Sequence, residues 1–97
     1  IDDEPLSEPD VARLARSVLA GGTIRFSGHA RQRLVEHQMS EIDVRNVLHG
    51  GRPEPAKYCS LENGTWRYRI ETPRMVVVIA FVDVTTIVVV TGWRKNE

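Results

Sequence analysis

The chain has 97 residues, of which 41% are hydrophobic and 27% charged, a composition typical of one globular domain with a single core. No apolar run approaches the roughly 20 residues needed to cross a bilayer, which argues against a membrane partner. The 13 basic and 13 acidic residues cancel, but five acids lie among the first ten residues. The remainder therefore carries a basic surplus, which permits a nucleic-acid partner without requiring one.

The sequence predicts an acidic, mobile lead over residues 1–7 and a single domain over residues 8–97. A first helix is expected from about residue 8 to residue 20, because its apolar residues recur three and four positions apart. Gly21-Gly22 ends that helix, and a short extended segment is expected over residues 23–26.

Two more helices are expected next. Ser27 can cap a helix that runs from residue 28 to about residue 37. The segment Ser40-Glu41-Ile42-Asp43 resembles a capping box with aspartate in the glutamate position, so it predicts the start of a third helix. The run Gly50-Gly51-Arg52-Pro53 ends this helix.

Beyond Pro55 the hydrophobic period changes to that of strands. Asn63-Gly64 is a strong tight-turn signal between the first two of four expected strands. These strands cover residues 56–60, 65–71, 75–82 and 86–90. Because the helices precede the strands, we expect an α+β fold with N-terminal helices packed on a C-terminal antiparallel four-stranded meander.

His29 and Arg33 lie four residues apart at the start of the second expected helix and therefore share one side of it. An imidazole can transfer protons near neutral pH, and a guanidinium offers a planar fork that fits phosphate. The pair therefore suggests proton transfer or phosphate contact. The alternative is a histidine that hydrogen-bonds locally and a solvated surface arginine.

Arg67 and Arg69 alternate with Trp66 and Tyr68 in the expected strand 65–71. Side chains two residues apart in a strand point the same way and lie about 7 Å apart, close to the spacing of adjacent phosphates. The two arginines can therefore contact adjacent phosphates together. Alternatively, they form cross-strand ion pairs on an exposed sheet face.

Thr91, Trp93 and Arg94 follow the last buried run of the sequence. At the end of a strand, these residues could stack on a base and hold a phosphate by charge. The alternative is an aromatic cap on the core, followed by a basic tail.

A metal site is not expected. His29, His37, His49 and Cys59 show none of the usual ligand spacings, and no glycine-rich phosphate loop occurs, so we expect neither metal nor cofactor. A single cysteine cannot form an internal disulfide, which favours a reducing, cytoplasmic location.

Four motifs in the chain resemble a bacterial family of unknown function whose genes often lie beside a YgiT-type zinc-finger antitoxin. That family is similar to the RelE/MqsR and barnase-like ribonucleases, and the resemblance extends over residues 23–94. The motifs are Phe-Ser-x-His-Ala-x-x-Arg-Leu from Phe26, Ile-Asp-Val-x-x-Val-Leu-x-x-Gly from Ile42, Trp-Arg-Tyr-Arg-Ile from Trp66 and Val-Val-Val-Thr-x-Trp from Val88.

The resemblance implies a metal-independent endoribonuclease toxin of a type II toxin–antitoxin system, neutralised by a bound antitoxin. In such enzymes the RNA 2′-hydroxyl attacks its own phosphodiester and leaves a cyclic phosphate. His29 matches the motif histidine and would transfer protons. Arg33 and Arg69 match arginines that would stabilise the phosphate charge, and Thr91 and Trp93 match the terminal motif that would position the nucleotide.

Several points stay open. Glu54 or Glu71 could act as the base, and neither is singled out. His37 stands where the resemblance leads us to expect an arginine, so one cation is missing. The main alternative to an enzyme is a noncatalytic RNA- or protein-binding module of the same fold. A third possibility is a structural protein whose sheet edge is completed by another chain.

Overall fold

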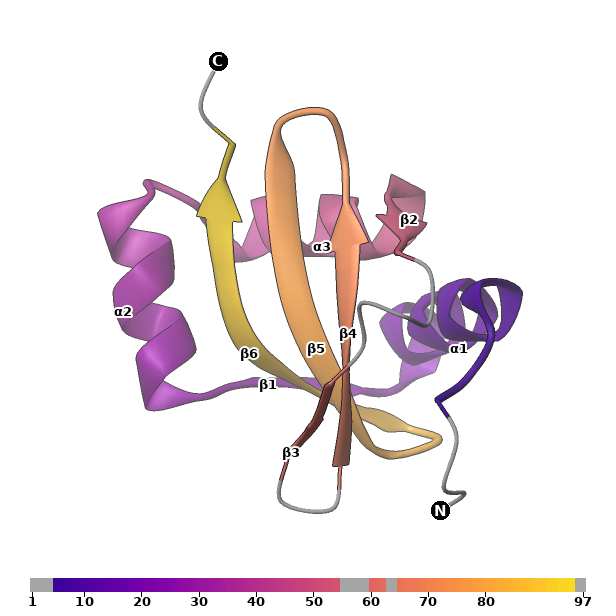
Figure 1. Cartoon of the computed structure of the whole chain (residues 1–97). Helices are drawn as coiled ribbons and strands as arrows, with labels where there is room; N and C mark the ends of the chain where they lie inside the picture. Colours follow the sequence, from indigo (N-terminus) through magenta and orange to yellow (C-terminus); the bar gives the residue numbers. More distant parts are fainter. Residues whose placement is uncertain (1–4, 55–59, 63–64, 96–97) are drawn as a thin grey trace.

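The computed structural model describes residues 5–54, 60–62 and 65–95. Within these described ranges, three helices pack with a six-stranded sheet (Figure 1). The helices are α1 (Glu8–Gly21), α2 (Gly28–Glu36) and α3 (Glu41–Gly50). The strands are β1 (Thr23–Phe26), β2 (Arg52–Pro53), β3 (Ser60–Glu62), β4 (Thr65–Glu71), β5 (Met75–Asp83) and β6 (Thr86–Arg94). In this part of the chain, no helix has both the length and the apolar character that a membrane span requires.

The strand order is β1-β6-β5-β4-β2, with β3 also paired to β4. The expected α+β class is confirmed, but the sheet is mixed because β1 runs parallel to β6, with Thr23 opposite Thr86. The short extended segment expected over residues 23–26 is thus a strand of this sheet, in addition to the four expected strands. A parallel partner far along the chain leaves no local signal, because its pairing is made through a long crossover connection.

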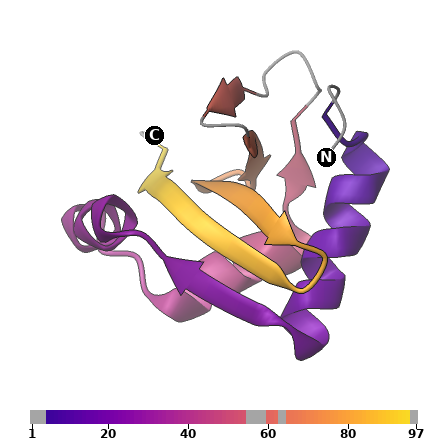
Figure 2. The ribbon, with the colours of Figure 1, turned by 90° about the horizontal axis from the view of Figure 1, so that it is seen from below.

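One face of the sheet is covered by helices and the other is not. Figure 2 shows α3 beneath the sheet with α1 and α2 at its two sides, and none of these helices lies over the opposite face. We call this opposite side the open face; it is turned toward the reader in Figure 1. Its described side chains include Arg67, Arg69, Glu71, Val78, Thr91 and Trp93.

The core lies between the helices and the covered face. It is built from alanines and branched aliphatic side chains of all three helices, packed on alternate residues of the central strands. Ile42 of α3 does not join this core, because it is 69% exposed. It lies two positions before Val44, which is buried, and residues two apart point to different sides of a helix.

The three predicted helix starts are confirmed in detail. The side chains of Ser7, Ser27 and Ser40 each accept a hydrogen bond from a backbone N–H in the first turn. At α3 the capping box is complete, because the Asp43 carboxylate also accepts from the Ser40 N–H at 2.9 Å. Ser27 additionally donates to the Val90 carbonyl at 3.3 Å, which fixes the start of α2 against β6.

Strand β6 is longer than predicted, because it continues beyond residue 90 to Arg94. A β-bulge interrupts its pairing with β5, where Val78 lies opposite Thr91 but Ile79 lies opposite Val89. The extra residue in β6 is therefore Val90. Since alternate residues of a strand face opposite sides, the bulge reverses the side to which the following residues point.

Parts of the expected structure lie outside the described residues. They are residues 1–4 of the lead, most of the expected strand 56–60, and the Asn63-Gly64 turn. In the described part of the lead, the Leu6 N–H donates to the Tyr68 hydroxyl at 3.0 Å, and Leu6 packs against the core.

Helix α2 ends in a backbone conformation that glycine adopts more readily than glutamine. Gln38 has a φ of 55°, in the left-handed region, and its N–H donates to the Val35 carbonyl at 3.1 Å. Met39 then donates to the Leu34 carbonyl at 2.8 Å, which completes a Schellman motif.

We therefore expect Gln38→Gly to raise the free energy of unfolding by about 1 kcal/mol, because glycine has no Cβ to clash in the left-handed region. As a matched control, Gln32→Gly within α2 should lower it by about 1 kcal/mol. Urea unfolding followed by circular dichroism measures both. A loss of stability in Gln38→Gly would contradict this account of the helix end.

Candidate functional site

The open face brings together residues from two motifs that are far apart in the sequence. In the register of the sheet, Arg69 lies opposite Val78, which lies opposite Thr91. The next such row contains Glu71 from β4 and Trp93 from β6. Residues paired in this way project from the same face. The arginine strand and the terminal motif therefore contribute to one surface.

Arg69 is held between an aromatic ring and a carboxylate. Its Cζ lies 5.3 Å from the centroid of the Trp93 ring, and its Nε lies 2.7 Å from Glu54 Oε2. The second contact is an ion pair without the alignment of a hydrogen bond. The Arg69 side chain remains 38% exposed. Arg69 is thus fixed in position and still accessible to an anion.

Glu54 and Glu71 lie beside each other at the same end of the sheet. Burial raises the pKa of Glu54 above its ordinary value, and the neighbouring Glu71 raises it further. The pKa of Glu71 is lowered, first by its hydrogen bond to Lys95, whose Nζ lies 2.8 Å from Glu71 Oε1. Two adjacent carboxyl groups thus differ in how readily they hold a proton, a common feature of acid–base sites.

A hollow of about 660 Å³ adjoins this carboxyl pair. Glu54, Glu71 and Lys95 contribute to its walls, together with residues at the start of α1, the end of α3, β2 and the turn after β4. Arg69, His29 and Arg33 are not among its lining residues. The hollow and the open face are therefore adjoining surfaces that share the carboxyl pair.

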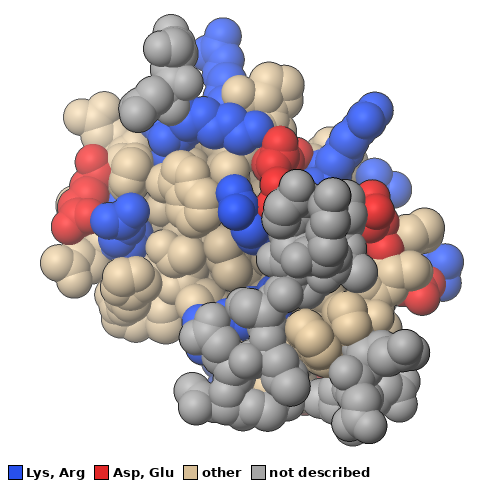
Figure 3. All heavy atoms as spheres, viewed as in Figure 1, with Lys and Arg blue, Asp and Glu red and all other residues tan. Residues whose placement is uncertain are grey.

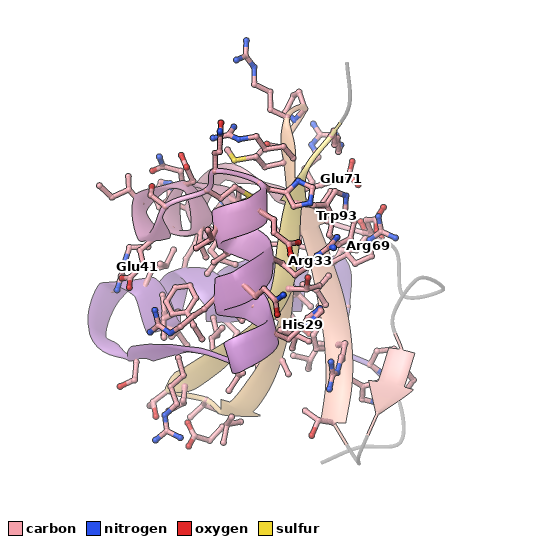
Figure 4. The ribbon with its side chains drawn as sticks, turned by 90° about the vertical axis from the view of Figure 1, so that its left-hand side faces the viewer. His29, Arg33, Glu41, Arg69, Glu71 and Trp93 are labelled. Carbon is pink, nitrogen blue, oxygen red and sulfur yellow. The ribbon has the colours of Figure 1, made fainter. Side chains whose placement is uncertain are left out.

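His29 and Arg33 border the open face from its other side. Figure 4 shows both on the side of α2 that is turned toward Arg69 and Trp93. His29 is exposed and has no hydrogen-bond or ion-pair partner among the described residues. Arg33 is half-buried and lies 3.5 Å from Glu36, a distance too long for a strong ion pair. The predicted common side of the helix is confirmed, and His29 makes no local hydrogen bond.

On this side of the molecule, charged side chains border an uncharged area. Figure 3 shows a central uncharged area with Lys and Arg atoms to its left, above it and to its right. A surface of this kind can bind the phosphates of a nucleic acid at its borders and a base at its centre.

Arg67 also projects from the open face, opposite Ala80 of β5. Its Nε is buried and has no hydrogen-bond partner among the described residues. A buried donor without a partner is costly, so an anion at this position would be stabilised.

Arg94, expected as an RNA-binding residue, makes contacts that stabilise the fold. Its side chain donates to the carbonyls of His37 at 2.9 Å and Gln38 at 3.0 Å, and lies 3.6 Å from Asp43. Its own N–H donates to His37 Nδ1 at 3.3 Å. Arg94 thus joins the end of α2 and the start of α3 to β6, and its guanidinium does not lie with Arg69. His37, which stands where an arginine was expected, takes part in the same contacts.

Lys95 is the site residue that sequence reasoning missed. It follows the terminal motif by two positions, and nothing in that spacing connects it with Glu71.

Among the described residues, no group of three His, Cys, Asp or Glu side chains could hold a metal ion. In comparisons with known proteins, no family model, no curated protein and no solved structure matches the chain.

Proposed function

We propose that the protein is a metal-independent endoribonuclease toxin with a RelE/barnase-like fold, and that the open face binds and cleaves RNA. One observation carries the proposal: Arg69 is stacked on Trp93 and lies beside a carboxyl group whose pKa is raised by burial. This arrangement offers a phosphate ligand, a base-stacking surface and a proton acceptor on one accessible surface. The resemblance of the four motifs to antitoxin-linked ribonucleases agrees with this chemistry.

RNA cleavage by the 2′-hydroxyl needs three contributions from a protein. A base removes the hydroxyl proton, cations stabilise the charge on the phosphorane, and an acid protonates the leaving 5′-oxygen. In our proposal one of the two carboxyl groups, Glu54 or Glu71, is the base and His29 is the acid. Arg69 and Arg33 stabilise the phosphorane. The products are a 2′,3′-cyclic phosphate and a 5′-hydroxyl.

The remaining site residues have binding roles in this proposal. Trp93 stacks on a base, Thr91 offers a hydroxyl beside it, and Arg67 binds the next phosphate along the strand. Arg94 supports the site through α2. The partner that neutralises the toxin would be an antitoxin protein of the YgiT type, and an RNA substrate implies action in the cytoplasm.

The test is to incubate the purified protein with RNA in the presence of a chelator and to analyse the new ends. We expect cyclic phosphates, and we expect His29→Ala to lower the rate about 100-fold, since proton transfer commonly contributes at least that much. The matched control is His49→Ala, because His49 is also exposed but lies on α3.

A noncatalytic RNA-binding module is the second candidate. It is favoured by the absence, among the described residues, of any group that orients the His29 ring. Intact RNA, with an affinity that falls as salt rises, would support the module and reject the enzyme. An affinity for RNA that does not change with salt would reject both and favour a structural partner.

A further inference from the structure

Three ionisable side chains from separate parts of the chain meet at one end of the sheet. Glu54 follows β2, Glu71 ends β4 and Lys95 follows β6. Their backbones are anchored: the Glu54 N–H donates to the Arg69 carbonyl at 2.9 Å, and the Lys95 N–H donates to the Arg74 carbonyl at 2.8 Å. The three side chains are therefore held together by the sheet itself.

The two carboxyl groups have unequal surroundings. Glu71 is 33% exposed and is paired with Lys95, with 2.8 Å between Nζ and Oε1. Glu54 is only 18% exposed, so its ionised form is less well hydrated. Arg69 lies 2.7 Å from Glu54 and partly offsets this cost. When the two carboxyl groups share one proton, that proton therefore resides mainly on Glu54 and the negative charge mainly on Glu71.

Other charged groups face the same pair. Glu8 from α1 and Arg52 from β2 line the adjoining hollow. The charged groups that shift the pKa of Glu54 are Arg69, Glu71 and Lys95, and neither Glu8 nor Arg52 is among them. The inequality between Glu54 and Glu71 thus has two sources, the deeper burial of Glu54 and the ion pair of Glu71 with Lys95.

We infer that Lys95 and Glu71 are positioning residues that make Glu54 the proton-accepting carboxyl group of the site. This inference rests on the proposed ribonuclease function. Glu54 takes the proton of the 2′-hydroxyl while O2′ bonds to phosphorus and the bond from phosphorus to O5′ breaks. The leaving oxygen takes its proton from the His29 imidazolium. Glu71 stays ionised throughout and accepts a hydrogen bond from Glu54 once Glu54 is protonated.

The first experiment does not need RNA. Carbon-13 NMR of the side-chain carboxyl carbons gives the titration midpoints of Glu54 and Glu71, assigned with Glu54→Gln and Glu71→Gln. In the unmodified protein we expect Glu54 to titrate at higher pH than Glu71. In Lys95→Met the Glu71 midpoint should rise and the gap between the two midpoints should narrow, because Lys95 lowers the pKa of Glu71 through a hydrogen bond and that of Glu54 only through its charge. Lys95→Arg keeps the charge and should keep the original order.

The second experiment measures the pH dependence of RNA cleavage. Glu54→Gln should lower kcat/KM about 100-fold, the usual contribution of a general base. In Lys95→Met the acid limb of the profile should broaden, because the two carboxyl groups then titrate closer together, and kcat should fall with KM unchanged, because Lys95 acts through Glu71. Lys95→Arg should restore the original profile.

The outcomes separate the two proposals. Unchanged carboxyl midpoints in Lys95→Met would overturn this inference even if the protein cleaves RNA. A raised KM in Lys95→Met, with a weaker salt dependence of binding, would also overturn it, because Lys95 would then bind phosphate directly. Absence of cleavage together with the expected midpoints would reject the ribonuclease and support the assignment of the proton to Glu54.

Discussion

Arg69→Gln is expected to lower the rate of RNA cleavage by about 100- to 1,000-fold, because removing one preorganised donor from a charged transition state typically has an effect of this size. Arg69 is held on the open face by two contacts: it stacks on Trp93 and pairs with Glu54. The substitution therefore removes the phosphate ligand and leaves the Glu54 carboxyl without its nearest cation.

The rate is best measured as kcat/KM on a short RNA, with folding checked by circular dichroism. Arg74→Gln is the matched control, since Arg74 is exposed in the turn between β4 and β5 and its side chain has no ion pair among the described residues. Arg69→Lys should retain only part of the activity, because an ammonium group lacks the planar fork of a guanidinium. Equal rates for Arg69→Gln and Arg74→Gln would show that the open face is not the catalytic surface.

Gly22→Ala is expected to give the largest loss of stability, about 3 kcal/mol, because forcing an extra carbon into a closely packed position commonly costs this much. A Cβ on Gly22 would overlap the Thr85 carbonyl oxygen and lie 3.1 Å from its carbonyl carbon. Here the end of α1 meets the turn between β5 and β6, where the Thr23 N–H donates to the Thr85 carbonyl at 2.8 Å. Both Thr85 atoms belong to the backbone, so neither can be moved aside by a change of side-chain rotamer.

Gly21→Ala is the matched control for this effect. A Cβ on Gly21 would meet no atom within 4 Å, and alanine favours the last turn of α1, so this variant should be as stable as the parent or more stable. Chemical unfolding of both variants measures the difference. If the two glycines tolerate alanine equally, the contact between α1 and the turn after β5 is less tight than the structure indicates.

Local signals explain which elements could be predicted from the sequence. A capping serine, a glycine pair or a run of alternating residues acts through neighbours a few positions away, so its effect is largely independent of the rest of the fold. This is why the starts of all three helices and the side-chain alternation of β4 follow from the sequence. The common side of α2 that holds His29 and Arg33 follows for the same reason.

The position of the terminal motif depends on long-range pairing. Had β6 continued in unbroken register after Val89, Thr91 and Trp93 would point into the core. The bulge at Val90 instead sends them to the open face, and Gly92 leaves room for Leu34 on the covered face, where a Cβ would lie 3.1 Å from Leu34 Cδ2. No sequence pattern within residues 86–94 predicts this change of side.

The sequence by itself determined the α+β class, the ends of the helices and the two arginines that share a face of β4. Only the tertiary structure decided that Trp93 lies over Arg69, that Lys95 pairs with Glu71, and that Arg94 supports α2. The physical reason is that these contacts depend on the register between strands and on the packing of helices against them. Register is fixed by the pairing of segments far apart in the chain, which leaves no mark on the spacing of neighbouring residues.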